Sequence, residues 1–192
     1  MARGRALGRA QEIVLASTSP QRRAILEQLR IPFRVVAPAY REVGDDPVEH
    51  AVGKARSVDG QGSPVLGVDT IVSLEGEVLG KPGSADEARA MVERLSGRTH
   101  EVVSGMCLRT AEWEEVARAV TLVTFRDLSA EEIAAYVEAG EWQGRAGGYA
   151  IQGFGASLVE RIDGDYLNVV GLPGGLLVGV LSTRFPDAAR LA

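Results

Sequence analysis

The sequence contains very few of the residues from which disulfide frameworks and zinc sites are built. Its single cysteine, Cys107, has no partner within the chain for a disulfide bond. The two histidines, His50 and His100, lie far apart in the sequence and lack the spacing of zinc ligands. These absences favour a reducing compartment, the cytoplasm, and argue against a zinc site.

The sequence also lacks an excess of positive charge and a long apolar run. Lysine and arginine number 21 against 26 acidic residues, and the net charge of −5 argues against a protein that binds nucleic acid by bulk electrostatics. The apolar run at residues 13–16 is too short for a signal-peptide core or a membrane span. We therefore expect residues 1–12 to be a flexible leader and residues 186–192 a frayed tail, on a soluble protein that binds neither nucleic acid nor a membrane.

Strand and helix patterns alternate through the rest of the chain. Apolar and β-branched runs predict strands over residues 13–16, 33–36, 65–74, 77–80, 100–108 and 116–125, and a hairpin of residues 156–162 and 166–170. Helical periodicity, with capping serines at Ser19, Ser84 and Ser129, predicts helices that begin near residues 20, 47, 85, 130 and 174. The first helix is expected to end at Pro32. The alternation predicts one α/β domain, residues 13–185, with a mixed sheet.

The segment LASTSPQRRAIL, residues 15–26, reads as a strand end, a polar turn and the start of a helix. A helix N-terminus carries partial positive charge, so Arg22 and Arg23 each cost about 0.3–1 kcal/mol relative to a neutral residue. A bound anion such as phosphate would reverse that cost, because Ser17, backbone N–H groups and a guanidinium could converge on it. The alternative is an ordinary N-cap followed by solvated arginines.

Asp69 lies inside an apolar strand pattern, in the stretch GVDTIV. A carboxylate in a buried strand is destabilised by desolvation unless a metal, a cation or hydrogen bonds hold it. Asp69 is therefore a candidate base or metal ligand. A structural aspartate bonded to a neighbouring loop, or an outward-facing residue at a sheet edge, are the alternatives. A phosphoaspartate hydrolase would have a second aspartate where this chain has Ile71.

Four further polar residues could each contribute to a binding site. Lys81 follows the strand pattern at residues 77–80, and Lys54 lies on the flank of the helix that begins at residue 47. Glu42, in a polar loop, could bring a carboxylate to Mg²⁺. Gln152, in a glycine-rich loop, could present its amide to a nucleobase edge. Each could equally be a solvated or backbone-bonded surface residue.

Five blocks in this order, LASTSPQRRAILEQL, GVDTIVSLEGEVLGKP, LSGRTHEVVSG, RAGGYAIQG and YLNVVGLP, resemble the Maf family of nucleoside triphosphate pyrophosphatases. The resemblance covers nearly the whole folded chain. It implies an inosine-triphosphatase-like fold, in which an elongated mixed sheet is flanked by helices and a cleft separates two lobes. It also implies hydrolysis between the α- and β-phosphates of a nucleoside triphosphate, with a divalent cation such as Mg²⁺ or Mn²⁺, and a homodimer.

The resemblance implies a role for each matching residue. Asp69 would be the proton acceptor that deprotonates or orients the attacking water, and Asp69 and Glu42 would hold the metal. The residues implied to bind the triphosphate are Ser17 and Arg22 of the turn, with Lys54 and Lys81.

Three positions are implied to set base preference. Thr70 and Gln152 have the residue types of members that act on dTTP and UTP. Gln21 departs from the pattern, because those members usually carry arginine there and a branch acting on 7-methyl-GTP carries tryptophan. Arg145 likewise stands where a lysine is common. The matches favour pyrimidine nucleotides, with modified pyrimidines included.

Two alternatives to a house-cleaning pyrophosphatase remain. One is a nucleotide-binding regulator of septum formation that arrests cell division and hydrolyses nucleotides only incidentally. The other is the same enzyme class with a different base preference. The presence of Asp69, Lys54 and Lys81 favours catalysis.

Overall fold

The computed structural model describes residues 12–185, so the expected tail and all of the expected leader except Glu12 lie outside the described residues. Seven strands of this part form one mixed sheet in the order β2-β1-β3-β5-β6-β7, with β4 paired to β3. The strands are β1 (Ile13–Ala16), β2 (Phe33–Val36), β3 (Val65–Leu74), β4 (Glu77–Leu79), β5 (Thr99–Arg109), β6 (Glu114–Phe125) and β7 (Val159–Asp163). Strand β1 is parallel to β2 and β3, and the remaining pairs are antiparallel. The prediction of an α/β fold with a mixed sheet is confirmed.

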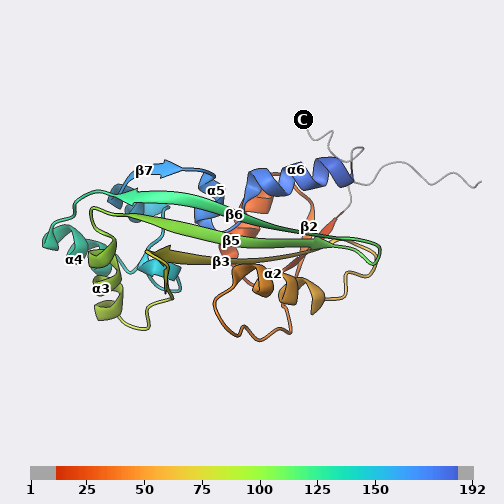
Figure 1. Cartoon of the computed structure of the whole chain (residues 1–192), viewed down its shortest axis with the longest axis horizontal. Coiled ribbons are helices and arrows are strands. Elements are labelled where there is room, and N and C mark those ends of the chain that lie inside the picture. Colours follow the sequence, from red (N-terminus) through yellow and green to blue (C-terminus); the bar gives the residue numbers. More distant parts are fainter. Residues whose placement is uncertain (1–11, 186–192) are drawn as a thin grey trace, which may run out of the picture.

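Helices cover both faces and one end of this sheet (Figure 1). They are α1 (Pro20–Gln28), α2 (Pro47–Arg56), α3 (Ala85–Leu95), α4 (Ala130–Ala139), α5 (Tyr166–Val170) and α6 (Gly174–Arg184). Helices α1 and α6 lie on the side of the sheet opposite to α2, whereas α3 and α4 lie at one end of the long strands. None of the helices in residues 12–185 is both long and apolar enough to cross a membrane.

The alternation of side chains along β1 explains the two-faced packing. Ile13 and Leu15 belong to a buried cluster with α1 and α6, whereas Val14 and Ala16 belong to a cluster with α2. A third cluster joins the far ends of β3, β5 and β6 to α3 and α4. The long strands therefore run through buried clusters at both ends of the molecule, and at one end each face of the sheet has its own cluster.

The predicted helix caps are largely confirmed. Ser129 caps α4, as the sequence predicts, and forms a reciprocal capping box with Glu132. At α3 the Ser84 hydroxyl accepts from the Glu87 N–H. The Glu87 carboxylate accepts from the Gly83 N–H at 2.7 Å and not from the N–H of Ser84. Helix α1 ends at Gln28, earlier than the expected stop at Pro32, because the chain turns through a left-handed residue at position 30 (φ 53°).

The predicted hairpin of residues 156–162 and 166–170 is wrong. Only Val159–Asp163 forms a strand, and residues 166–170 form helix α5. The Asp165 carboxylate accepts from the Leu167 N–H at 2.8 Å, so an N-cap overrides the strand propensity of a stretch rich in tyrosine and valine. Buried Asn168 then ties α5 to β5 by donating to the Val102 carbonyl at 3.0 Å.

The edge of β3 has a gap between its two neighbours. Strand β1 pairs with β3 as far as Gly67, and β4 pairs with β3 from Val72 onward. Within the described chain, residues 68–71 have no strand partner on that side. Asp69 and Thr70 lie in this gap, so polar side chains from both faces of the sheet can reach the same space.

Two glycines allow helix α2 to lie unusually close to the sheet. A Cβ atom at Gly67 of β3 would lie 2.1 Å from the Ala51 carbonyl oxygen, and one at Gly105 of β5 would lie 2.1 Å from the Pro47 carbonyl oxygen. Both clashes would be with backbone, which cannot move aside as a flexible side chain can. The glycines therefore place the inner face of α2 directly against Asp69.

Candidate active site

A large cavity of about 640 Å³ opens at the gap in the sheet edge. Its volume lies within the range of small-molecule sites. Its walls come from both ends of the molecule. The turn after β1 and helix α2 form one side, and β4 and the glycine-rich loop, residues 144–152, form the other. The cavity is lined by every residue that the sequence singles out for the site, namely Ser17, Gln21, Arg22, Glu42, Lys54, Asp69, Thr70, Lys81 and Gln152.

Lys54 joins the two carboxylates of the predicted site. Its Nζ lies 2.6 Å from Asp69 Oδ1 and 2.5 Å from Glu42 Oε1. The side chains of Lys54 and Asp69 are only 9% and 13% exposed, whereas that of Glu42 is 53% exposed. The sequence placed Lys54 on the flank of its helix, but the contact of α2 with the sheet buries it. An ion pair in such surroundings is screened far less than a surface pair.

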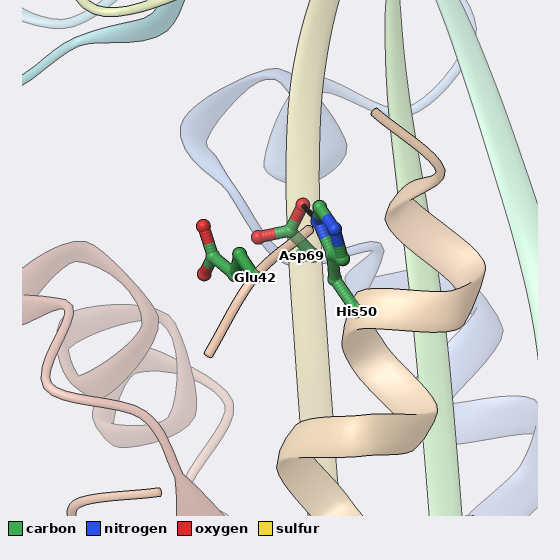
Figure 2. A group of neighbouring side chains, drawn as sticks. All are labelled: Glu42, His50 and Asp69. Carbon is green, nitrogen blue, oxygen red and sulfur yellow. Dashed lines mark hydrogen bonds and ion pairs between the residues drawn. The ribbon is translucent and has the colours of Figure 1, made fainter. Parts of the chain in front are cut away.

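His50 is a site residue that sequence reasoning missed. It lies one helical turn before Lys54 on α2, is 4% exposed, and points toward Asp69 (Figure 2). Its Nδ1 lies 3.2 Å from Asp69 Oδ2, and its Nε2 lies 3.2 Å from the Val43 carbonyl oxygen. The spacing of four between His50 and Lys54 was the available signal, because it places both side chains on one face of the helix.

Arg22 lines the cavity and Arg23 does not. Its Nε donates to the Gly171 carbonyl at 2.9 Å, and its two Nη atoms donate to Ser17 Oγ at 3.2 Å and Thr70 Oγ1 at 3.3 Å. Burial lowers the pKa of the Arg22 guanidinium, while the negative charges of Asp69 and Glu42 act in the opposite direction. Arg23 is exposed, so the two neighbouring arginines have different surroundings.

The Thr70 hydroxyl faces protein groups in this structure. It accepts from Arg22, donates to the Gly171 carbonyl at 3.3 Å, and lies 2.8 Å from the Ser104 hydroxyl. Ser104 is fully buried. Thr70 is thus connected to the turn after β1 through Arg22.

On the opposite wall, formed by β4 and the glycine-rich loop, the polar side chains make fewer contacts with other protein groups. Lys81 and Gln152 are exposed and Arg145 is half-buried. Neither Lys81 nor Arg145 forms an ion pair with an acidic side chain of residues 12–185. Gln21, on the near wall, accepts from Ser19 Oγ through its amide oxygen at 3.1 Å, which leaves its NH₂ group free to donate.

The cavity brings four cationic side chains together beside three carboxylates, those of Glu42, Asp45 and Asp69, in a chain whose net charge is −5. The cations that line it are Arg22, Lys54, Lys81 and Arg145. A polyanion such as a triphosphate would complement them, because charge-assisted hydrogen bonds are among the strongest that side chains make.

The acidic side of the cavity fits a divalent cation. Glu42, His50 and Asp69 each offer a donor atom, and these atoms lie within 4.8 Å of one another. Carboxylate oxygens suit Mg²⁺ and Mn²⁺, and an imidazole nitrogen suits the transition metals. Asp46, which follows Glu42 in the same polar loop, instead caps α2 by accepting from the Val48 N–H at 2.8 Å.

The remaining histidine and the cysteine are structural. His100 is buried against Tyr149 and Phe125, and burial lowers its pKa to about 4. Cys107 is fully buried in the core with α2, where burial raises the thiol pKa to about 11. A thiol so hard to ionise is a poor nucleophile.

Comparison with known proteins extends over almost all of the chain. The model of a family described as Maf-like protein matches residues 12–184. A protein of Symbiobacterium thermophilum named dTTP/UTP pyrophosphatase is 48% identical over 172 residues, which cover 85% of this chain and 89% of that protein. Proteins with the same name from Nitratidesulfovibrio vulgaris and Pyrococcus furiosus are 45% and 44% identical, covering 91% and 85% of this chain and 89% and 90% of their own lengths. The solved structure of the Staphylococcus aureus Ham1 protein is 17% identical, with a TM-score of 0.43 over 61% of this chain and 73% of that one.

Proposed function

Because the chain belongs to the Maf-like protein family, we propose that it is a nucleoside triphosphate pyrophosphatase that prefers dTTP and UTP. It hydrolyses the bond between the α- and β-phosphates and releases a nucleoside monophosphate and diphosphate. One observation carries the proposal: Asp69 lies in the strand gap, in contact with Lys54, within a cavity whose other cations can hold a triphosphate.

Asp69 is the proposed proton acceptor. Water attacks the α-phosphorus, a proton passes to the Asp69 carboxylate, and the bond from the α-phosphorus to the bridging oxygen breaks. Lys54 donates to Asp69 Oδ1 at 2.6 Å, which fixes the orientation of the carboxylate. A base that is already oriented avoids the entropic cost of finding its position during the reaction.

The cations are proposed to stabilise the charge that develops on the phosphates. Arg22 and Ser17 would bind phosphate oxygens at the turn after β1, and Lys54 would face the reacting phosphorus. Lys81 would approach from the other wall and neutralise the departing diphosphate. Charge stabilisation of this kind dominates catalysis of phosphoryl transfer.

Glu42 and Asp69 would hold a divalent cation, Mg²⁺ or Mn²⁺. When bound, such an ion supplies positive charge close to the phosphate oxygens and polarises the phosphorus for attack. Lys54 takes one oxygen of each carboxylate, which leaves the second oxygen of each available. The two carboxylates can therefore serve a lysine and a cation together.

We place the reaction in the cytoplasm, where a free buried thiol such as Cys107 stays reduced. A homodimer stays a prediction from the family resemblance. The proposal is tested by incubating the purified chain with Mg²⁺ or Mn²⁺ and a panel of canonical and modified nucleotides. Release of diphosphate and a monophosphate, fastest from dTTP or UTP, is expected; release of orthophosphate alone would contradict the site of cleavage.

Gln21 provides a test of base preference. Replacing Gln21 with arginine restores the residue type usual in members that act on dTTP and UTP, and adds donors that suit the carbonyl oxygens of a pyrimidine. We expect kcat/KM for dTTP relative to dGTP to rise by about tenfold, which corresponds to about 1.4 kcal/mol. Steady-state kinetics on both nucleotides measure the ratio. An unchanged ratio would show that position 21 does not read the base in this protein.

A further inference from the structure

The contacts of His50 leave one of its nitrogens facing a group that cannot donate to it. The Val43 carbonyl can only accept, so Nε2 must carry the proton of a neutral ring. Nδ1 then presents a lone pair to Asp69 Oδ2, which lies 3.2 Å away. An ionised carboxylate is also only an acceptor. With a neutral ring, two lone pairs would face each other where His50 is 4% exposed, so a proton or a metal ion has to lie between the two atoms.

A cation shared by the two atoms would turn this repulsion into attraction. Two neighbouring ligands of a cation with bonds of about 2.1 Å at right angles lie about 3 Å apart. The observed separation of 3.2 Å between Nδ1 and Oδ2 is close to that value. Glu42 contributes a third donor within 4.8 Å of both, and Figure 2 shows the three side chains beside one another.

The surroundings of the ring are also those of a metal-binding histidine. A metal-bound imidazole characteristically donates its other N–H to a backbone carbonyl or a carboxylate, which fixes the ring and its tautomer. Val43 supplies that carbonyl, and it directly follows Glu42 in the chain. The ring of Tyr40 lies 6.1 Å from that of His50, centroid to centroid, and covers α2 at Gly53. The loop that brings Glu42 is thus connected to the histidine at two points.

We infer that His50 is a ligand of the divalent cation, together with Asp69 and Glu42, and that its nitrogen makes this site prefer Mn²⁺ to Mg²⁺. The inference deepens the proposed function and rests on it for the role of the ion. Mg²⁺ favours an all-oxygen shell, whereas an imidazole nitrogen contributes more to the binding of Mn²⁺ and the later transition metals. The site would then discriminate between ions through a residue on α2 that has no part in binding phosphate.

The test measures metal binding without turnover. Mn²⁺ is titrated into the metal-free full chain, alone and with the non-hydrolysable α,β-methylene analogue of dUTP, and pulsed electron paramagnetic resonance records nitrogen coupled directly to the ion. We expect a directly coordinated nitrogen in the wild type and none in His50→Leu. We also expect His50→Leu to bind Mn²⁺ on the order of tenfold more weakly, with a change in Mg²⁺ affinity of less than about threefold.

Two further variants separate the loss of the His50 nitrogen from a change in its surroundings and from unfolding. Tyr40→Phe changes a neighbour of the ring but keeps His50, so it should keep the nitrogen signal and the preference for Mn²⁺. If circular dichroism shows that His50→Leu is unfolded, His50→Gln provides a smaller polar replacement and should also lack the signal. The inference is overturned if wild-type Mn²⁺ shows no coordinated nitrogen with or without the analogue, or if the preference survives in the folded His50 variants.

These outcomes are independent of the proposed activity. Diphosphate release by a wild type without a nitrogen ligand would leave the pyrophosphatase proposal intact and remove only the role of His50. A nitrogen ligand in a protein that releases no diphosphate would do the reverse.

Discussion

Replacing Asp69 with asparagine should lower kcat for dTTP hydrolysis by about 1,000-fold, within the range that general-base catalysis contributes. Asparagine keeps the size of the side chain but cannot accept a proton from water, and it is a much weaker ligand for a divalent cation. It also removes the negative charge that pairs with buried Lys54. Diphosphate release under saturating dTTP with Mg²⁺ or Mn²⁺ measures the loss.

The matched control is Asp45→Asn, because Asp45 also lines the cavity but is absent from the group around Lys54. We expect its kcat to stay within about twofold of wild type. Robust hydrolysis by Asp69→Asn would refute the role of Asp69 as proton acceptor. Overproduction in cells separates catalysis from the binding alternative: division arrest that is equal with wild type and Asp69→Asn would favour the regulator.

Replacing Lys54 with methionine should lower kcat on the order of 100- to 1,000-fold, as the loss of one preorganised electrostatic donor does elsewhere. Methionine has a similar length and fills the same space without charge. Its introduction leaves the carboxylates of Glu42 and Asp69 without the ammonium group that lies between them. Kinetics with dTTP separate the effect on kcat from that on KM, and a transition-state role predicts that the loss falls mainly on kcat.

Arg56→Met is a suitable control on the same helix. Arg56 is exposed, pairs with Glu114 and does not line the cavity, so its removal should change stability slightly and kcat by less than about twofold. Lys54→Arg should restore part of the lost activity, because it returns the charge with a different shape. Equal losses in Lys54→Met and Arg56→Met would mean that general positive charge, and not the position of Lys54, is what matters.

The sequence predicted those parts of the fold that depend on local pattern. The β-branched run of β3 and the capping residues of α3 and α4 each determine their own element through contacts within a few positions. Asp69 was recognisable for a similar reason, since a charged residue in an apolar strand needs a partner. The error at α5 arose where one local signal, an aspartate cap, competed with another, a strand-like composition.

Contacts that join distant segments could not be read from the sequence in the same way. The hydrogen bond from Arg22 to the Gly171 carbonyl spans 149 positions and depends on the packing of α1 and the turn before α6. The contact of His50 with Asp69 depends on the close approach of α2 to the sheet and on the course of the loop through Val43. The spacing of His50 and Lys54 on α2 indicates only that they share a face of the helix, and the Gly171 carbonyl has no sequence signal, so their partners became visible only in three dimensions.

The glycines under helix α2 have a consequence for how the protein tolerates change. Because main-chain atoms at Gly67 and Gly105 set the separation of α2 from β3 and β5, the spacing between Lys54 and Asp69 does not depend on which side chains happen to fill the layer between them. Substitutions on the outer face of α2 can alter stability or solubility while the floor of the cavity keeps its dimensions. The positions of His50 and Lys54 relative to Asp69 are therefore expected to stay the same when residues on the outer face of α2 change.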